Sequence, residues 1–143
     1  MKKCARYAGL VLVVLLVMVF QSCDLLTGWI SGCTVVQADG WHGPFSLTTS
    51  NPLSSSGYHY ESFCVNAVGG TTYRFGLQTD VRGVGLSVFH NGVEDEVLWT
   101  YGANEAWDTR LVPESGLVSF SVWVNRNRIS SGSARYSFYL APD

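Results

Sequence analysis

Five residues that could bind a ligand lie close together late in the chain, within Trp99-Thr-Tyr-Gly-Ala-Asn-Glu-Ala-Trp107. Trp99, Tyr101 and Trp107 supply flat rings, and the pattern places Asn104 and Glu105 at the tip of a loop between two strands. Such rings stack on the C–H faces of sugars while amides and carboxylates bond hydroxyls, and the same ring types dominate contacts between proteins. The stretch therefore indicates a glycan or protein site, and packing of the rings in the core is the alternative.

Residues for catalysis or metal binding do not occur at the required spacings. His42, His59 and His90 are far apart in the sequence, and neither HExxH nor CxxC occurs. A GxSxG nucleophile motif is also missing, as is a glycine-rich phosphate loop that opens a helix. We expect no enzymatic activity, no resident metal and no cofactor.

The acidic run Glu94-Asp-Glu96 admits a second interpretation. Calcium takes six to eight oxygen ligands, and Asp80 or Asp108 could add to the three carboxylates. On a strand, however, Asp95 points away from the face that Glu94 and Glu96 share. A charged edge strand that resists edge-to-edge pairing is the other interpretation, and the sequence leaves both open.

The first 22 residues are expected to form a secretory signal peptide. Met1-Lys-Lys-Cys-Ala-Arg6 is positively charged, and Ala8–Phe20 is an apolar run of 13 residues without charge. A helix that spans a bilayer needs about 20 such residues, so this run is too short for a permanent span. The pattern predicts export.

Cys23 directly follows this segment. Phe20-Gln-Ser-Cys23 resembles the lipobox of bacterial lipoproteins, in which a small residue precedes a cysteine that receives acyl chains such as palmitate. The resemblance implies that Cys23 is the mature N-terminus and is anchored to a membrane. Two or three acyl chains would hold the protein firmly, because each buried methylene contributes about 0.8 kcal/mol. In the alternative, the signal peptide is an ordinary one and Cys23 remains a thiol or a disulfide partner.

The remaining cysteines depend on that choice. Cys4 leaves with the signal peptide, so lipidation of Cys23 would leave Cys33 and Cys64 as an even pair in an oxidising compartment, where a disulfide is expected. Without lipidation three thiols would remain.

Charge argues against a nucleic-acid partner. The whole chain carries −2, and loss of Lys2, Lys3 and Arg6 with the signal peptide leaves −5 and no lysine. Nucleic-acid binding usually needs a net basic face. Residues 23–32 would form a short tether of at most about 30 Å, which is followed by one domain at 33–143.

Alternation of apolar and polar residues predicts an all-β domain. Phe63, Val65 and Ala67 alternate with polar residues. The same alternation places two later sets of apolar residues inward: Phe120, Val122 and Val124, and Tyr136, Phe138 and Leu140. His90-Asn-Gly-Val93 has the Asn-Gly pair of a two-residue hairpin. The expected strands are about eight, near 45–49, 59–68, 71–79, 84–90, 93–101, 106–112, 117–125 and 134–141. Trp123 falls on the outward phase of its strand.

A family resemblance supports this architecture. Ser62-Phe-Cys-Val-Asn-Ala-Val-Gly-Gly-Thr-Thr-Tyr73 resembles the SFxVxAGxxY core of bacterial pre-peptidase C-terminal domains, and Ala134-Arg-Tyr-Ser-Phe-Tyr-Leu140 resembles their final strand. Where the family has an aspartate-rich DxDLYLY strand, this chain has Gly83-Val-Gly-Leu-Ser-Val-Phe89. The resemblance covers residues 45–141 and implies a jelly-roll-like antiparallel β-sandwich without catalytic activity.

Together these features predict a membrane-anchored, extracytoplasmic lipoprotein of the bacterial cell envelope that acts as a binding module, with glycan as the expected ligand. The alternative is a structural or accessory subunit whose aromatic residues dock on a partner envelope protein.

Overall fold

The computed structural model describes residues 32–90, 93–100, 104–129 and 132–143, and Cys33–Asp143 form one compact unit. Within the described residues the chain forms nine strands and one short 3-10 helix, η1 (Arg126–Arg128). The strands are β1 (Thr34–Val36), β2 (Gly40–Thr48), β3 (Tyr58–Ala67), β4 (Thr71–Thr79), β5 (Val84–His90), β6 (Val93–Trp99), β7 (Glu105–Val112), β8 (Gly116–Asn125) and β9 (Ser133–Pro142).

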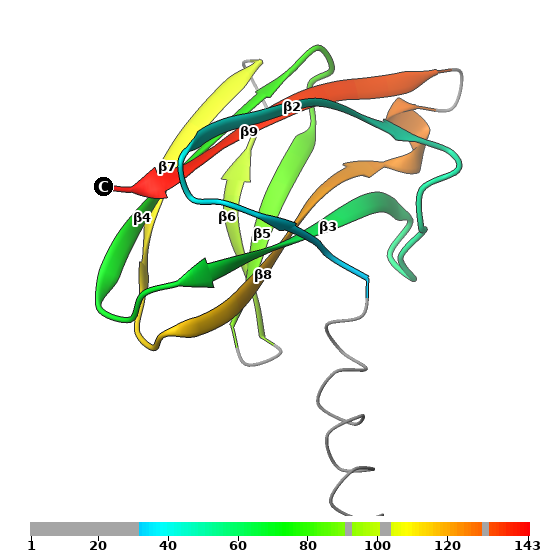
Figure 1. The fold of residues 1–143 in the computed structure, drawn as a ribbon. Coiled ribbons are helices and arrows are strands. Elements are labelled where there is room, and N and C mark those ends of the chain that lie inside the picture. The colour runs from blue at the N-terminus through cyan, green and yellow to red at the C-terminus, as the bar shows by residue number, and fades with distance from the viewer. Residues whose placement is uncertain (1–31, 91–92, 101–103, 130–131) are drawn as a thin grey trace, which may run out of the picture. The chain divides into compact units, whose positions relative to one another are not determined.

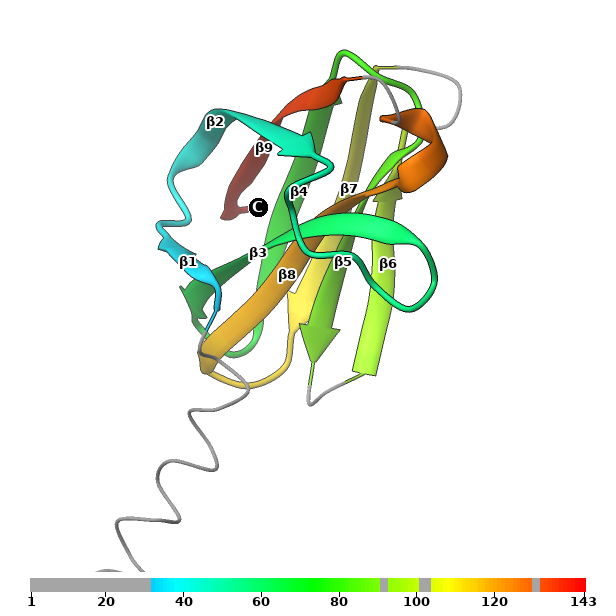
Figure 2. The ribbon, with the colours of Figure 1, turned by 90° about the vertical axis from the view of Figure 1, so that its right-hand side faces the viewer.

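The strands form two sheets that pack face to face as a β-sandwich (Figures 1 and 2). The five-stranded sheet has the order β1-β3-β8-β5-β6, and the four-stranded sheet has the order β2-β9-β4-β7. All pairings are antiparallel except that of β1 with β3. This confirms the predicted all-β sandwich.

The core lies between the sheets and is aromatic at its centre. Phe63 of β3, Phe120 of β8 and Phe138 of β9 are fully buried. The ring centroids of Phe63 and Phe138 lie 4.7 Å apart, and those of Phe120 and Phe138 lie 5.1 Å apart. Burial of each such side chain contributes about 1.5–3 kcal/mol. The predicted alternation is confirmed, because inward residues of these strands are buried.

Two strand predictions need correction. β1 was not predicted, because three residues are too few to show alternation. β2 begins at Gly40, not near residue 45, because its register shifts between His42 and Phe45, where Gly43 and Pro44 interrupt the alternating pattern. Pro44 is tolerated there because β2 is an edge strand, and an edge strand does not need every backbone donor.

The β5–β6 connection has the register of a two-residue hairpin, with His90 opposite Val93. Asn91 and Gly92 themselves lie outside the described residues.

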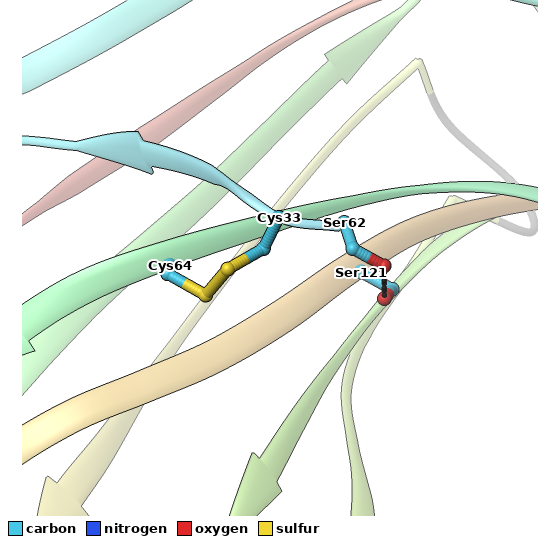
Figure 3. Close-up of a disulfide and its surroundings, with 4 residues drawn as sticks. All are labelled: Cys33, Ser62, Cys64 and Ser121. Atoms are coloured by element: carbon cyan, nitrogen blue, oxygen red, sulfur yellow. Dashed lines mark hydrogen bonds between the residues drawn. A yellow bond between two sulfur atoms is a disulfide. The ribbon is translucent and has the colours of Figure 1, made fainter. Parts of the chain in front are cut away.

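A disulfide joins Cys33 to Cys64, with the two Cα atoms 5.6 Å apart (Figure 3). Cys64 belongs to the outward-facing set of β3, and two residues away Ser62 Oγ is hydrogen-bonded to Ser121 Oγ of β8 at 2.9 Å. The bond ties the start of the domain to the second strand of the five-stranded sheet, and the predicted pairing is confirmed.

No helix in the described part of the chain has the length and apolar character needed to cross a membrane.

Candidate functional site

Three aromatic side chains form a cluster on the outer face of the four-stranded sheet. Trp41 of β2 lies opposite Tyr139 of β9, Tyr139 lies opposite Gly76 of β4, and Gly76 lies opposite Trp107 of β7. This register places the three rings in one row across all four strands. Their centroids are 5.3–5.6 Å apart and their planes are steeply inclined to one another. We call Trp41, Tyr139 and Trp107 the aromatic cluster.

The cluster is open to solvent. Trp41 is 45% exposed and Trp107 is 39% exposed, although both are large apolar side chains. Contiguous exposed apolar surface of this kind commonly marks an interaction site, whereas single exposed hydrophobic residues are ordinary. Gly76 makes the arrangement possible, because it leaves space in the row for the neighbouring indole.

Polar groups flank the cluster on the neighbouring rows of the sheet. On one side, Trp107 Nε1 donates to Glu105 Oε1 at 2.5 Å and Gln78 Nε2 donates to Glu105 Oε2 at 3.2 Å. These two hydrogen bonds, that from Trp107 first, lower the pKa of Glu105 below its usual 4.5. On the other side, the Arg74 guanidinium carbon lies 4.7 Å from the centre of the Trp107 ring. The cluster therefore has a carboxylate on one side and a cation on the other.

The five residues predicted to form a loop site are not all brought together. Glu105 and Trp107 lie in β7 and join the aromatic cluster, as described above. Trp99 ends β6, which belongs to the other sheet. Asn104 is exposed, and its backbone carbonyl accepts a hydrogen bond from Thr79 N at 2.8 Å. Tyr101 lies outside the described residues.

Trp99 belongs instead to a second aromatic group, on the outer face of the five-stranded sheet. Its ring centroid is 4.3 Å from that of Trp123, and Tyr58 contacts Trp123 from another side at 5.0 Å. Trp123 Nε1 donates to Ser87 Oγ at 2.8 Å. Trp123 does lie on the outward phase of β8, as its position in the alternation predicted, but it is only 9% exposed. Within this second group Trp123 therefore packs inside the domain, whereas Trp99 and Tyr58 are partly exposed.

Trp41, Tyr139, Arg74 and Gln78 were missed in the sequence. Alternation could have identified Tyr139, because its neighbours Phe138 and Leu140 point inward. No comparable signal marked Trp41, because the register shift in β2 follows directly after it.

The acidic positions considered for calcium are partly engaged by an arginine. Arg110 Nε lies 3.1 Å from Asp95 Oδ2, and Arg110 Nη1 lies 2.9 Å from Asp108 Oδ2. This arginine links β6 and β7, the edges of the two sheets, and forms an ion pair with each of the two carboxylates. Residues 32–143, as far as they are described, contain no group of three or more His, Cys, Asp or Glu placed to hold a metal. The Glu96 side chain lies outside that description.

Cys23, the proposed lipid attachment point, also lies outside the described residues.

No family model matches the sequence, and no curated protein matches it significantly. Solved structures do resemble its fold. The pre-peptidase C-terminal domain of a collagenase from Bacillus anthracis aligns with a TM-score of 0.54 and 11% identity, over 78% of this chain and 94% of that one. PliG from Aeromonas hydrophila, a periplasmic inhibitor of g-type lysozyme, aligns with a TM-score of 0.50 and 15% identity, over 78% of this chain and 98% of that one. At these identities the similarity shows a shared β-sandwich fold, in agreement with the resemblance seen in the sequence.

Proposed function

We propose that this protein is a lipid-anchored, extracytoplasmic binding module of the bacterial cell envelope, without catalytic activity, that binds glycan through the aromatic cluster. The observation that carries the proposal is the exposure of Trp41 and Trp107 in one row with Tyr139. A solvent-exposed indole face can stack on a sugar ring, and Gln78 and Glu105 supply amide and carboxylate groups that can bond hydroxyls beside it.

The disulfide supports an extracytoplasmic location. Bonds such as Cys33–Cys64 form and persist in oxidising compartments and are rare in the cytosol. Because Cys33 and Cys64 pair with each other, Cys23 is left as the one cysteine after the signal peptide without a disulfide partner in the chain. This is the arrangement expected if Cys23 carries the lipid.

Docking on a partner envelope protein is the second candidate function. The observation that favours it is the stacking of Arg74 on Trp107, because Trp, Tyr and Arg are the residues enriched at protein-binding hot spots. In this arrangement the guanidinium already covers part of the ring that a sugar would need.

Single substitutions in the cluster separate these functions. We expect Trp41→Ala and Tyr139→Ala to weaken binding to purified envelope glycans about tenfold, equivalent to about 1.4 kcal/mol per ring. Leu111→Ala is the matched control, since Leu111 is 62% exposed on β7 of the same sheet and lies opposite Thr72, two rows from the cluster.

Glycan binding by the wild type that is lost in the cluster variants, with an unchanged melting temperature, would support the first function. Loss of a protein that co-purifies with the wild type, in the absence of glycan binding, would support the second. A large fall in melting temperature for Trp41→Ala would show that the rings serve stability and would contradict both.

Lipidation is tested separately by intact mass. The membrane-extracted wild type should have the mass of residues 23–143 plus acyl chains, and C23S should lack them. An unmodified wild type cleaved elsewhere would contradict the anchor.

A further inference from the structure

The arginines of the domain are concentrated at one end of the sandwich. Residues 33–143 contain six arginines and ten carboxylate side chains, so the domain has a net charge of 6 − 10 = −4. Four of the six arginines nevertheless lie at the end where β4 leads into β5 and where β8 leads through η1 into β9. We call these four the arginine end: Arg82, Arg126, Arg128 and Arg135.

Hydrogen bonds and one side-chain contact hold the segments of this end together. Arg126 N donates to Gly57 O at 3.0 Å, which links η1 to the start of β3. The Arg128 side chain lies beside Gly83: a Cβ added to Gly83 would be 3.7 Å from Arg128 Nε. Arg128 is therefore next to the segment that carries Arg82. Arg135 N donates to Asp80 Oδ1 at 2.8 Å. The four arginines therefore come from three connected segments.

These arginines are available to bind an anion. Across the described residues, Arg110 is the arginine that forms ion pairs, and none is formed by the four residues of the arginine end. Asp80 lies within the three segments, and Glu105 begins β7 at the same end, opposite Gln78, so the exposed charges at this end sum to 4 − 2 = +2. Glu94, Glu114 and Asp143 lie toward the opposite end, near the β5–β6 and β7–β8 connections and the C-terminus. The domain is thus electrically polarised along its strands.

A polar depression adjoins the arginines. Its volume is about 290 Å³, and its lining consists of hydroxyl, amide and guanidinium groups with a glycine: Ser55, Ser56, Gly57, Asn125, Arg126 and Asn127. Hydroxyl and amide groups beside a guanidinium are suitable donors to phosphate oxygens.

We propose that the arginine end rests on the anionic phospholipid headgroups of the membrane to which the chain is anchored. The inference rests on the lipid anchor of the proposed function, and chain length supports this occupant. The described domain starts at Cys33, and Thr34 pairs with Phe63, five residues along β3 from Tyr58 at the arginine end. The distance along β3 from Phe63 to Tyr58 is about 17 Å. A tether of about 30 Å between Cys23 and Cys33 is therefore long enough for the arginine end to reach the bilayer surface.

Local charge, not net charge, makes the contact favourable. An acidic domain is repelled by an anionic surface as a whole, but charges more than about 10 Å away are screened at 0.1 M salt. The arginine end would therefore be attracted to the anionic membrane, because salt screens the repulsion between the membrane and the acidic residues at the far end of the strands. This orientation holds the strands upright on the membrane and leaves the outer face of the four-stranded sheet, with the aromatic cluster, open to the envelope.

Vesicle binding of an unlipidated chain tests the proposal independently of the anchor. The probe is mature protein (residues 23–143) bearing C23S, mixed with phosphatidylcholine vesicles with or without phosphatidylglycerol. We expect binding only to the vesicles that contain phosphatidylglycerol, and it should be lost in about 1 M salt, where the Debye length falls to about 3 Å. R126Q and R128Q should each weaken it about fivefold, the change that corresponds to one arginine at a membrane surface.

R74Q is the matched control, because Arg74 is an exposed arginine on the face of the sheet and not at its end; it should bind as the parent does. Equal weakening by R74Q and R126Q, or equal binding to both kinds of vesicle, would overturn the proposal. So would binding to a soluble polyanion such as heparin without binding to vesicles. If the unlipidated chain does not bind vesicles but the intact mass shows a lipidated wild type, this inference fails and the proposed function stands. If the chain binds vesicles but the wild type carries no lipid, the anchor is refuted and the headgroup site stands.

Discussion

The six-membered ring of Trp107 occupies the place that a side chain at Gly76 would take. The two residues are cross-strand neighbours, and a Cβ at Gly76 would lie 2.5 Å from Trp107 Cζ3. Trp123 stands in the same relation to Gly85 on the other sheet. A glycine inside a strand offers no side chain to pack, and a neighbouring aromatic ring can cover the bare backbone. Each glycine therefore positions one tryptophan.

Gly76→Ala should displace Trp107 from the aromatic cluster. The added methyl group overlaps a rigid ring, and overpacking of this kind costs about 1–3 kcal/mol of the free energy of unfolding. Chemical denaturation measures the loss, and glycan or partner binding should fall with it. Gly132→Ala is the control, because nothing lies within 4 Å of a Cβ there. Equal stability of the two variants would contradict the arrangement of Gly76 and Trp107.

The hydrogen bond between Trp107 and Glu105 should be sensitive to acid only at low pH. The pKa of Glu105 is lowered by hydrogen bonds in the folded protein, so the carboxylate's contribution is present above its usual 4.5 and is lost as pH falls through the lower folded-state value. Tryptophan fluorescence should therefore be constant above pH 4.5 and change below it. Glu105→Gln should abolish the Trp107 component of that change. A transition above pH 4.5 would contradict this account.

Removal of the disulfide should destabilise the domain substantially. The bond spans a sequence separation of 31 residues, and in the chain-entropy model closure of such a loop contributes between about 3 and 4 kcal/mol. The double variant C33S/C64S, compared with the wild type in urea, measures this contribution. Mass mapping without reducing agent should show a peptide linking Cys33 to Cys64, and free thiols at both positions would refute the pairing.

Tyr136 and Glu61 form a hydrogen-bonded pair at the margin of the core. Tyr136 Oη donates to Glu61 Oε2 at 2.6 Å, and the tyrosine is almost fully buried. Tyr136→Phe should cost about 1–3 kcal/mol, because it leaves a half-buried carboxylate without that donor. Urea denaturation at neutral pH measures the loss. A variant as stable as the wild type would show that water replaces the donor at no cost.

The same pair predicts a dependence on alkaline pH. Burial, together with the hydrogen bond and charge of Glu61, raises the pKa of Tyr136 far above its usual 10. The folded protein therefore retains a proton that the unfolded chain releases, so this contribution is complete below pH 10 and is lost as pH rises above it. Stability measured between pH 8 and 11 should fall less steeply in Tyr136→Phe than in the wild type. Parallel curves would contradict the assignment.

The inward faces of the strands could be predicted because burial on one face imposes a period of two. Phe63, Phe120 and Phe138 were all placed correctly by that rule, and they meet in the core. The Asn-Gly pair likewise predicted the antiparallel pairing of β5 with β6. Local chemistry was sufficient in both cases.

The composition of the aromatic cluster could not be predicted, because it depends on which sheet each strand joins. Trp99 and Trp107 are eight residues apart in the sequence, but β6 and β7 edge different sheets, so their rings lie on different faces. Conversely, Trp41 and Tyr139 are distant in the sequence and adjacent in space through the pairing of β2 with β9. Alternation gives the face of a residue within its own strand and contains no information about long-range strand order.

The disulfide also determines how the domain would respond to tension from its N-terminal side. β1 pairs with β3 at only three positions, so a pull on β1 alone would meet little mechanical resistance. The Cys33–Cys64 bond carries the force past β1 directly to β3, which pairs with β8 at ten positions. A module held at its N-terminus could therefore bear a load on its bound ligand without peeling its edge strand away.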